Sequence, residues 1–473
     1  MAGIQSIGIG SGLDANSIIT QLLALERQPL VRLQKAASGV QSQISLYGNM
    51  RSKADAVGSS ARTLADDDTW RATTVNLNGA DEFTVSAGGT AAPTNLEVEI
   101  TALAQRQGVS TRAFASASAE VGTGILTIQR GSWSAGFGNF TAAAGAAPIE
   151  VMIGTGQSSL SAIRDAINGA NAGVTATILN DTGGARLVIR SKDTGQDNGF
   201  AISTLAATGD FAALGFTGQT VPAGAAGAQG DARATDLQAK VNGATVTSAG
   251  NTLSNVLDGV SITATKPTAS ARTVTIQRDL AGMKGKIEAF VTAYNDLIGF
   301  IRTQTAYNEA TKTGAPLQGD RIALLVQSRV RGATLEPSGA TSAFGRLSDV
   351  GVALQTDGSL KVDQTKMNKA LDQLDAVAQL FTRDEEGTAQ DGVAVRIESL
   401  VKALTGTDGT IDSKQTSLRA VLRRNQQDQT RMEDRLADVE KRLKARYTAL
   451  DNQMSSLNGL GAYVARQFGP TST

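Results

Sequence analysis

Both ends of this 473-residue chain carry apolar residues at the seven-residue spacing of a coiled coil, and this repeat limits the fold more than any other feature. In the N-terminal part, Asp14 is placed to cap a short helix that Pro29 ends or bends, and a longer helix follows the proline. The residues that we predict to make leg or oligomer contacts here, the N-terminal seam, are Leu22, Leu23, Leu30, Leu33, Val40 and Ile44.

The C-terminal part repeats this arrangement in one very long helix. Asp412 and Gln415 resemble a capping box, and no proline follows until Pro470, so a helix over about 413–468 is predicted. Its predicted contact residues, the C-terminal seam, are Leu436, Leu443, Tyr447, Leu450, Met454, Leu457 and Val464. Two successive four-residue steps between Val439 and Tyr447 are typical of a stutter, which changes the supercoil locally.

Either seam alone is compatible with an ordinary amphipathic helix that is buried on its own domain. Two matching seams at opposite ends of one chain instead favour an antiparallel hairpin, with the residues between them forming a head. A stalk of this kind is narrow. We therefore expect part of each apolar stripe to stay exposed until neighbouring subunits cover it.

Between the helical ends, the apolar period changes to that of strands. Residues 96–100, 174–178 and 260–264 alternate apolar and polar side chains, which predicts antiparallel strands with one exposed face. The sequence thus predicts an α+β multidomain fold, with long terminal helices forming a coiled-coil-like leg, a helical/β neck domain and a β-rich head of two nested domains. The predicted boundaries are 1–65 and 411–473 for the leg, 66–80 and 280–410 for the neck, 81–112 and 232–279 for the inner head domain, and 113–231 for the outer head domain.

Two residue types are absent, and their absence removes most familiar catalytic chemistry. The chain has no cysteine and no histidine, so thiol nucleophiles, disulfides, Cys/His zinc sites and imidazole bases are excluded. A carboxylate pair or a magnesium site stays open, but no convergent acidic pair is visible in the sequence. We expect no enzyme activity, no metal and no cofactor.

The charge balance argues against nucleic acid and membranes as partners. Lys+Arg is 44 and Asp+Glu is 44, so the formal net charge is +0 and no overall field attracts a polyanion. Arg419, Arg423 and Arg424 form a basic band without interleaved aromatic residues, which indicates surface ion pairs rather than base stacking. The first apolar run, residues 18–25, has no basic leader and contains polar residues, so neither a cleaved signal peptide nor a membrane insertion is predicted.

Short motifs spread in order over the chain point to one family. They are SGLD at 11–14, LLALERQPL at 22–30, NTLSNVLDGV at 251–260, YNDL at 294–297, DGSL at 357–360, and Arg446-Tyr447 with Met454 and Tyr463. This set resembles the flagellar filament cap proteins, the family also called hook-associated protein 2 or FliD. A second set, AIN at 166–168, GVTA at 173–176 and RLVI at 186–189, resembles the module that this family shares with flagellins, placed here at 158–204.

The resemblance implies a structural assembly protein at the distal tip of the bacterial flagellum, outside the cell, exported by the flagellar type III route without a cleaved signal peptide. It implies a self-assembled ring, with five subunits favoured and six possible, whose flexible legs promote the insertion and folding of exported flagellin. The implied partners are further copies of the chain, flagellin, hook–filament junction proteins and a cytoplasmic export chaperone that binds the C-terminal helix.

Other functions stay open at this point. A hook–filament junction protein or a flagellin-like filament subunit also surrounds a β-rich head with paired terminal helices, although DGV at 258–260 argues against both. An adhesive role for the head is compatible with a cap function. A carboxylate-dependent hydrolase would need a cleft lined by two cooperating acidic side chains.

Overall fold

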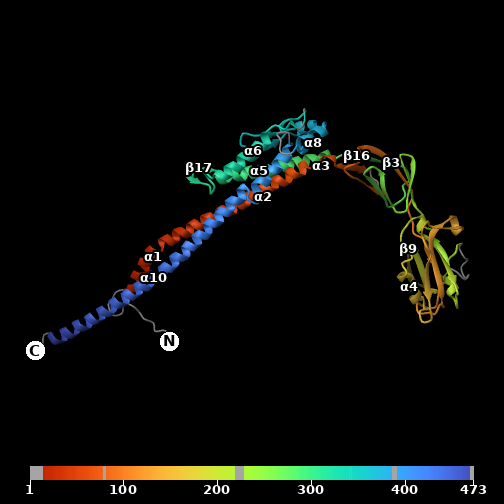
Figure 1. Ribbon diagram of the computed structural model, residues 1–473, viewed down its shortest axis with the longest axis horizontal. Coiled ribbons are helices and arrows are strands. Elements are labelled where there is room, and N and C mark those ends of the chain that lie inside the picture. Colours follow the sequence, from red (N-terminus) through yellow and green to blue (C-terminus); the bar gives the residue numbers. More distant parts are fainter. Residues whose placement is uncertain are drawn as a thin grey trace. The chain divides into compact units, whose positions relative to one another are not determined.

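The computed structural model describes residues 14–77, 81–218, 228–339, 341, 343–385 and 391–468. It divides into two compact units, Met1–Trp70 together with Leu280–Thr473, and Arg71–Asp279. We call the first the helical unit and the second the β-rich unit, and describe each by itself (Figure 1).

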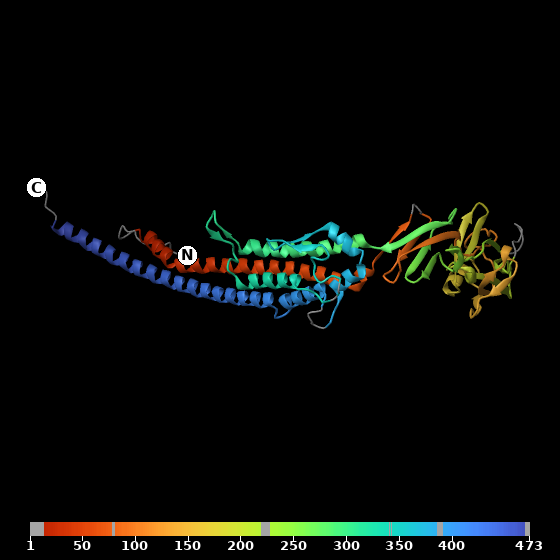
Figure 2. The ribbon, with the colours of Figure 1, turned by 90° about the horizontal axis from the view of Figure 1, so that it is seen from above.

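The helical unit contains two long helices that lie side by side and run antiparallel, α2 (Gln28–Ala65) and α10 (Thr410–Phe468) (Figure 2). The short helix α1 (Ala15–Glu26) precedes α2, and the Asp14 side chain accepts a hydrogen bond from the Ser17 amide, as a helix cap does. Pro29 lies in the first turn of α2, where its missing amide proton costs no hydrogen bond. The two helices predicted around Pro29 are therefore confirmed.

The predicted capping box of the last helix is wrong. Helix α10 begins at Thr410, so Asp412 and Gln415 already lie inside it. Asp412 instead accepts a hydrogen bond from Arg51 of α2 (3.1 Å), and the Gln415 amide donates to the Ile44 carbonyl (3.5 Å). Because the helix starts about one turn earlier than the motif indicates, both side chains form hydrogen bonds to α2 instead of capping α10.

The rest of the helical unit packs around the C-terminal half of α2. It consists of α3 (Asp67–Arg71, whose last residue falls in the β-rich unit), α5 (Leu280–Thr305), α6 (Arg321–Leu335), α7 (Gln364–Leu371), α8 (Leu374–Thr382), α9 (Val393–Thr405) and the two-stranded pairs β17 (Tyr307–Asn308) with β18 (Thr313–Gly314) and β19 (Val352–Leu354) with β20 (Leu360–Val362). Helices α5 and α9 both pack against α2. The residues of α2 buried in this core are Tyr47, Met50, Ala54, Val57, Ala61 and Leu64. The second half of α2 thus belongs to a multi-helix core, and the half-buried Val40 and Ile44 also pack against this core.

The turn between β19 and β20 is centred on Asp357-Gly358, a residue pair that is typical of tight turns. Gly358 has a positive φ of 86°, which glycine adopts without strain. The Asp357 carboxylate accepts hydrogen bonds from the Ser359 amide (3.0 Å) and hydroxyl (2.6 Å) and from the Arg302 guanidinium of α5 (2.8 Å). Through these bonds, above all that from the Ser359 hydroxyl, the pKa of Asp357 falls to about 2.

This carboxylate predicts a pH-dependent contribution to the stability of the helical unit. Its pKa in the folded state lies below the ordinary 3.8, so its contribution is present above about pH 4 and is lost as the pH falls towards 2. We expect the difference in urea midpoint between the wild type and Asp357→Asn to be constant from pH 7 to 5 and to shrink between pH 4 and 2. A difference that does not change with pH would contradict this account.

The β-rich unit contains four sheets. Two share one core: a five-stranded sheet with the order β1-β16-β3-β12-β13 and a three-stranded sheet with the order β14-β15-β2. The other two, β10-β5-β6 with β7 on β5, and β11-β4-β9-β8, enclose a second core with α4. The bounds are β1 (Thr73–Leu77), β2 (Phe83–Ala87), β3 (Thr94–Ala102), β4 (Gly108–Ser110), β5 (Gly124–Trp133), η1 (Ala135–Phe137), β6 (Phe140–Ala142), β7 (Ile149–Ile153), α4 (Leu160–Gly169), β8 (Val174–Asp181), β9 (Gly184–Ser191), η2 (Gln196–Asn198), β10 (Gly199–Leu205), η3 (Phe211–Leu214), β11 (Gln229–Ala232), β12 (Leu237–Val241), β13 (Ala244–Ser248), β14 (Thr252–Leu257), β15 (Val260–Ala264) and β16 (Arg272–Arg278).

The two cores are nested in the sequence. The second core uses buried residues between Val109 and Ala228, and the first uses residues on both sides of that stretch, from Phe83 to Ala104 and from Leu237 to Ile276. The predicted α+β architecture, with long terminal helices and a β-rich head of two nested domains, is therefore confirmed. The residue boundaries of the seven predicted segments stay a prediction.

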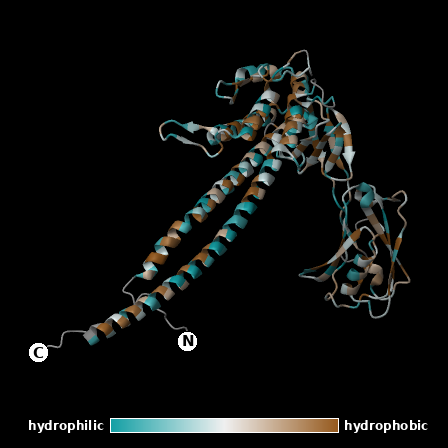
Figure 3. Ribbon diagram, turned by 60° about the vertical axis from the view of Figure 1, so that its left-hand side comes forward, coloured by the Kyte–Doolittle hydropathy of each residue, from teal (hydrophilic) through white to brown (hydrophobic). Residues whose placement is uncertain are grey.

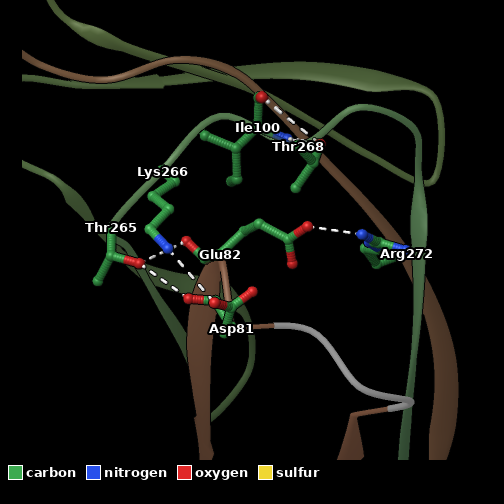
Figure 4. A network of polar contacts seen from close by, with 7 residues as sticks. All are labelled: Asp81, Glu82, Ile100, Thr265, Lys266, Thr268 and Arg272. Atoms are coloured by element: carbon green, nitrogen blue, oxygen red, sulfur yellow. Dashed lines mark hydrogen bonds and ion pairs between the residues drawn. The ribbon is translucent and has the colours of Figure 1, made fainter.

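A polar network joins the two sheets of the first core (Figure 4). Glu82, just before β2, accepts a hydrogen bond from Arg272 of β16 (2.6 Å), and Lys266 approaches Asp81 (3.3 Å). These bonds lower the pKa of Glu82, through Arg272, and of Asp81, through Lys266. The Thr268 hydroxyl accepts a hydrogen bond from the Ile100 amide of β3 (3.0 Å). The loop between β15 and β16 is thereby fixed to strands of both sheets.

Four side-chain amides act as substitutes for a neighbouring strand. Each bonds to both the amide and the carbonyl of a single residue: Gln107 to Phe200, Asn168 to Ala176, Asn251 to Ala104, and Asn295 to Leu360. This pairing satisfies two backbone groups that would otherwise need a strand or water. Asn168, Asn251 and Asn295 lie in the motifs that resemble the cap family, so these motif residues support the fold.

Candidate functional site: the terminal helices

Helix α1 packs against α10 along one face. Its buried residues, Ala15, Ile19 and Leu23, are spaced four apart and so lie on one side of the helix. Leu22 and Leu25 point away and are exposed. Of the two predicted contact residues in α1, Leu23 is used within one copy of the chain and Leu22 is not.

The seam residues of α2 face α10 but are covered only in part. Leu30, Leu33, Val40 and Ile44 are all half-buried, whereas Tyr47, the next member of the series, is completely buried. Two helices alone cannot enclose a residue between them from every side, and Val40 and Ile44 lie at the edge of the multi-helix core. These four residues are thus partly covered within one copy of the chain, and their role in leg or oligomer contacts stays a prediction.

The seam of α10 becomes more exposed towards its C-terminal end. Leu436 is buried, and Leu443, Tyr447 and Met454 are half-buried. Leu450, Leu457 and Val464 are exposed by 41%, 63% and 47%. Among the described residues, no other helix lies beside this last part of α10 in Figures 1 and 2, and apolar segments recur along it in Figure 3. The structure covers the first half of the C-terminal seam and leaves the second half uncovered.

Two polar residues, Asn425 and Gln429, interrupt the row of partly buried residues along α10, and we call them the polar layer. Both side chains are half-buried, and the Gln429 amide donates to the Asn425 side-chain oxygen (2.6 Å). Asn425, Gln429, Met432 and Leu436 follow one another at steps of four, three and four residues, so they lie on one side of the helix. Polar residues in such a row reduce stability but fix the register of the helices. The sequence-based prediction missed this layer because it followed only the apolar residues.

A polar junction marks where the multi-helix core ends. The buried Tyr47 hydroxyl donates to Asp320 (2.5 Å), which also caps α6 and lies 3.3 Å from Lys414 of α10. Burial and the Asp320 carboxylate raise the pKa of Tyr47, so it stays a donor. Burial alone would raise the pKa of Asp320, but bonds from Tyr47 and from the amides of α6 hold it below its ordinary value. This junction ties α2, α6 and α10 together, and nothing in the local sequence indicates it.

A hollow of about 520 Å³ in the helical unit gathers several acidic side chains. It is lined by Asp66, Asp67, Asp384 and Glu398 together with Lys402. Glu398 accepts a hydrogen bond from Arg62 (2.7 Å), and Asp66 accepts one from the Asp68 amide in α3 (3.0 Å). Within the described ranges, no group of three acidic residues is arranged to hold a metal ion, and no helix is long and apolar enough to cross a membrane.

Comparison with known proteins identifies the family. The family model of the flagellar hook-associated protein 2 N-terminus matches residues 11–107, and that of its C-terminus matches residues 234–459. The flagellar hook-associated protein 2 of Escherichia coli (strain K12) is 30% identical over 99% of this chain and 98% of its own length. The chain belongs to the flagellar hook-associated protein 2 family. A third model, the flagellin hook IN motif, matches residues 139–193.

Further relatives agree with this family. The flagellar hook-associated protein 2 of Salmonella typhimurium is 28% identical over 99% of both chains. The crystal structure of the D1-D2-D3 domains of the flagellar cap protein FliD from Escherichia coli has a TM-score of 0.62 and 27% identity, and covers 79% of this chain and 99% of that chain. The resemblance to the cap family is confirmed. Hook-associated protein 2 is a family of structural cap proteins rather than of enzymes.

Proposed function

We propose that this protein caps the distal end of the bacterial flagellar filament as a self-assembled ring, and that its flexible legs promote the insertion and folding of exported flagellin. One observation carries the proposal. The apolar row Leu450, Leu457 and Val464 continues the seam of α10 beyond the residues that the described part of the chain covers. An exposed apolar row of this kind favours a partner helix, and membership of the cap family supports a partner in the flagellum.

The partners follow from the same proposal. They are further copies of the chain in a ring, with five subunits favoured and six possible, together with flagellin and the hook–filament junction proteins. Before export, a cytoplasmic chaperone binds the C-terminal helix and covers its apolar row. The protein then leaves the cell by the flagellar type III route without a cleaved signal peptide and acts outside the cell at the filament tip.

The position of the protein on the flagellum tests this function. The chain has no cysteine, so a single introduced cysteine at the exposed Thr247 of β13 is the only site for a thiol-reactive dye. In motile cells that carry Thr247→Cys, we expect fluorescence at the distal end of each filament and nowhere else. Label along the whole filament would indicate a filament subunit, and label next to the hook would indicate a junction protein; either result would contradict the proposal.

A further inference from the structure

The five-stranded sheet of the β-rich unit ends in a strand, β13, whose outer edge is open. Strand β13 pairs with β12 in an unbroken antiparallel register that runs from Leu237 opposite Ser248 to Val241 opposite Ala244. Among the described residues, β12 is its only hydrogen-bonded neighbour in the sheet. The other edge of β13 therefore has no partner strand.

The register of this hairpin determines which backbone groups lie on the open edge. The turn between β12 and β13 is Asn242-Gly243, and both residues have a positive φ (49° and 80°), as in a type I′ turn. The pair that closes such a turn exchanges both of its backbone hydrogen bonds, and bonded and non-bonded pairs then alternate along the ladder. Val246 is thus bonded to β12. Thr245 and Thr247 direct their N–H and C=O groups away from the sheet.

Other edge strands of the β-rich unit are covered or interrupted. The Asn168 amide occupies the edge of β8 at Ala176. Phe216 exchanges two backbone hydrogen bonds with Ile202 of β10, both 2.7 Å long. Register shifts break the ladders of β11 and β14. In the part of the chain that the structure describes, β13 has none of these devices, and its sequence ATVTS contains no charge and no proline. Edge strands that avoid pairing normally carry such protection.

The open edge of β13 is complementary to itself. With a two-fold axis at Val246, Thr245 of one copy lies opposite Thr247 of the other, and each such pair can exchange both backbone hydrogen bonds. The two Val246 side chains meet on the core side of the sheet, where Val246 already packs, and the threonines meet on the exposed side. Because the strand is uncharged, self-pairing brings no like charges face to face. A second copy of the same strand therefore fits the edge.

The contact is small. It is limited to the five residues of β13, because the loop at Gly195 lies against Ala249 directly after the strand. Backbone hydrogen bonds exchanged with water contribute little net free energy, and association costs translational and rotational freedom. We expect a dissociation constant in roughly the micromolar range or weaker.

We propose that two copies of this chain pair through β13 about a two-fold axis at Val246, so that their five-stranded sheets form one continuous sheet. The paired form belongs to free copies at high concentration. It covers an edge that is otherwise open to any extended segment. A two-fold contact joins two copies and closes no ring of five or six, so this inference is independent of the proposed cap function.

A disulfide across the axis tests both the pairing and its register. The chain has no cysteine, so Val246→Cys places a single thiol in each copy, and cysteine is close enough to valine in size to keep the packing. Residues opposite each other in a non-hydrogen-bonded pair have Cα atoms about 4.5 Å apart, within the reach of a disulfide. Thr247→Cys is the matched control. In the proposed register, two Thr247 residues have Cα atoms about 8 Å apart, beyond that reach.

We expect mild oxidation of the full-length Val246→Cys chain to give a disulfide-linked dimer about tenfold faster, or more, than Thr247→Cys. Thr247→Pro, added to Val246→Cys, should slow this cross-link by about tenfold, because proline removes an outward N–H that a single copy does not use. Thr247→Val keeps this N–H and should leave the rate unchanged. Circular dichroism compares the folded content of all variants.

Three results would overturn the inference. Equal cross-linking of Val246→Cys and Thr247→Cys would indicate random collision rather than a fixed register. The absence of a cross-link in Val246→Cys would show that the edges do not pair. An unchanged rate with Thr247→Pro would show that the outward N–H takes no part in the contact.

Discussion

Replacing Leu457 with aspartate should abolish capping while leaving the isolated protein as stable as the wild type. Leu457 is 63% exposed in a single copy, so its replacement removes no packed contact from the fold. In the assembled cap, the proposed partner helix would bury the new carboxylate. Burial of an unpaired charge costs roughly 3 kcal/mol or more, which lowers an association constant by more than about a hundredfold.

The measurement for Leu457→Asp combines a thermal melt with an assay of flagella. We expect an unchanged melting temperature, short or absent filaments, and unpolymerised flagellin in the medium. Ser455→Asp is the matched control, because Ser455 is exposed on the same turns of α10 but outside the seam. Leu443→Asp should also abolish capping, but Leu443 is half-buried, so it should lower stability as well. Normal filaments in the Leu457→Asp strain would show that this row has no partner.

Replacing Trp70 with alanine should destabilise the helical unit by about 3–5 kcal/mol. The indole is buried and stacks on Phe381 of α8 with the ring centroids 5.2 Å apart. Its ring N–H donates to the Leu64 carbonyl at the end of α2 (2.9 Å), so alanine leaves both a cavity and an unpaired carbonyl. Trp70→Phe keeps much of the packing and should cost about 1–2 kcal/mol, mainly for the lost hydrogen bond.

The second tryptophan provides the control for this experiment. The chain has two tryptophans, and Trp133 lies in the β-rich unit, where its ring N–H donates to the Phe200 carbonyl (2.8 Å). In Trp70→Ala, the urea midpoint followed by helical circular dichroism should fall, and the midpoint followed by Trp133 fluorescence should stay unchanged. A shift of both midpoints together would mean that the two units unfold as one, contrary to the division described here.

Features with local causes could be predicted from the sequence. The cap at Asp14 and the position of Pro29 each depend on residues a few positions apart, and both are confirmed. The local signal failed at Asp412, because Thr410 starts the helix earlier and Arg51 takes the carboxylate. The heptad rows were visible because burial on one side of a helix leaves a periodic trace in its sequence.

Features with long-range causes could not be predicted. The Tyr47–Asp320–Lys414 junction joins three elements that are far apart in the sequence, and the amide of Asn295 bonds to Leu360 across 65 positions.

The sequence by itself determined that the two ends are long amphipathic helices around a β-rich middle, because helix and strand periods are properties of neighbouring residues. It also determined the family, through motifs whose asparagines support the fold. Only the tertiary structure decided which seam residues are covered within one copy. That depends on where α1 lies against α10 and on where the surrounding helices end, which are long-range packing outcomes that no local period encodes.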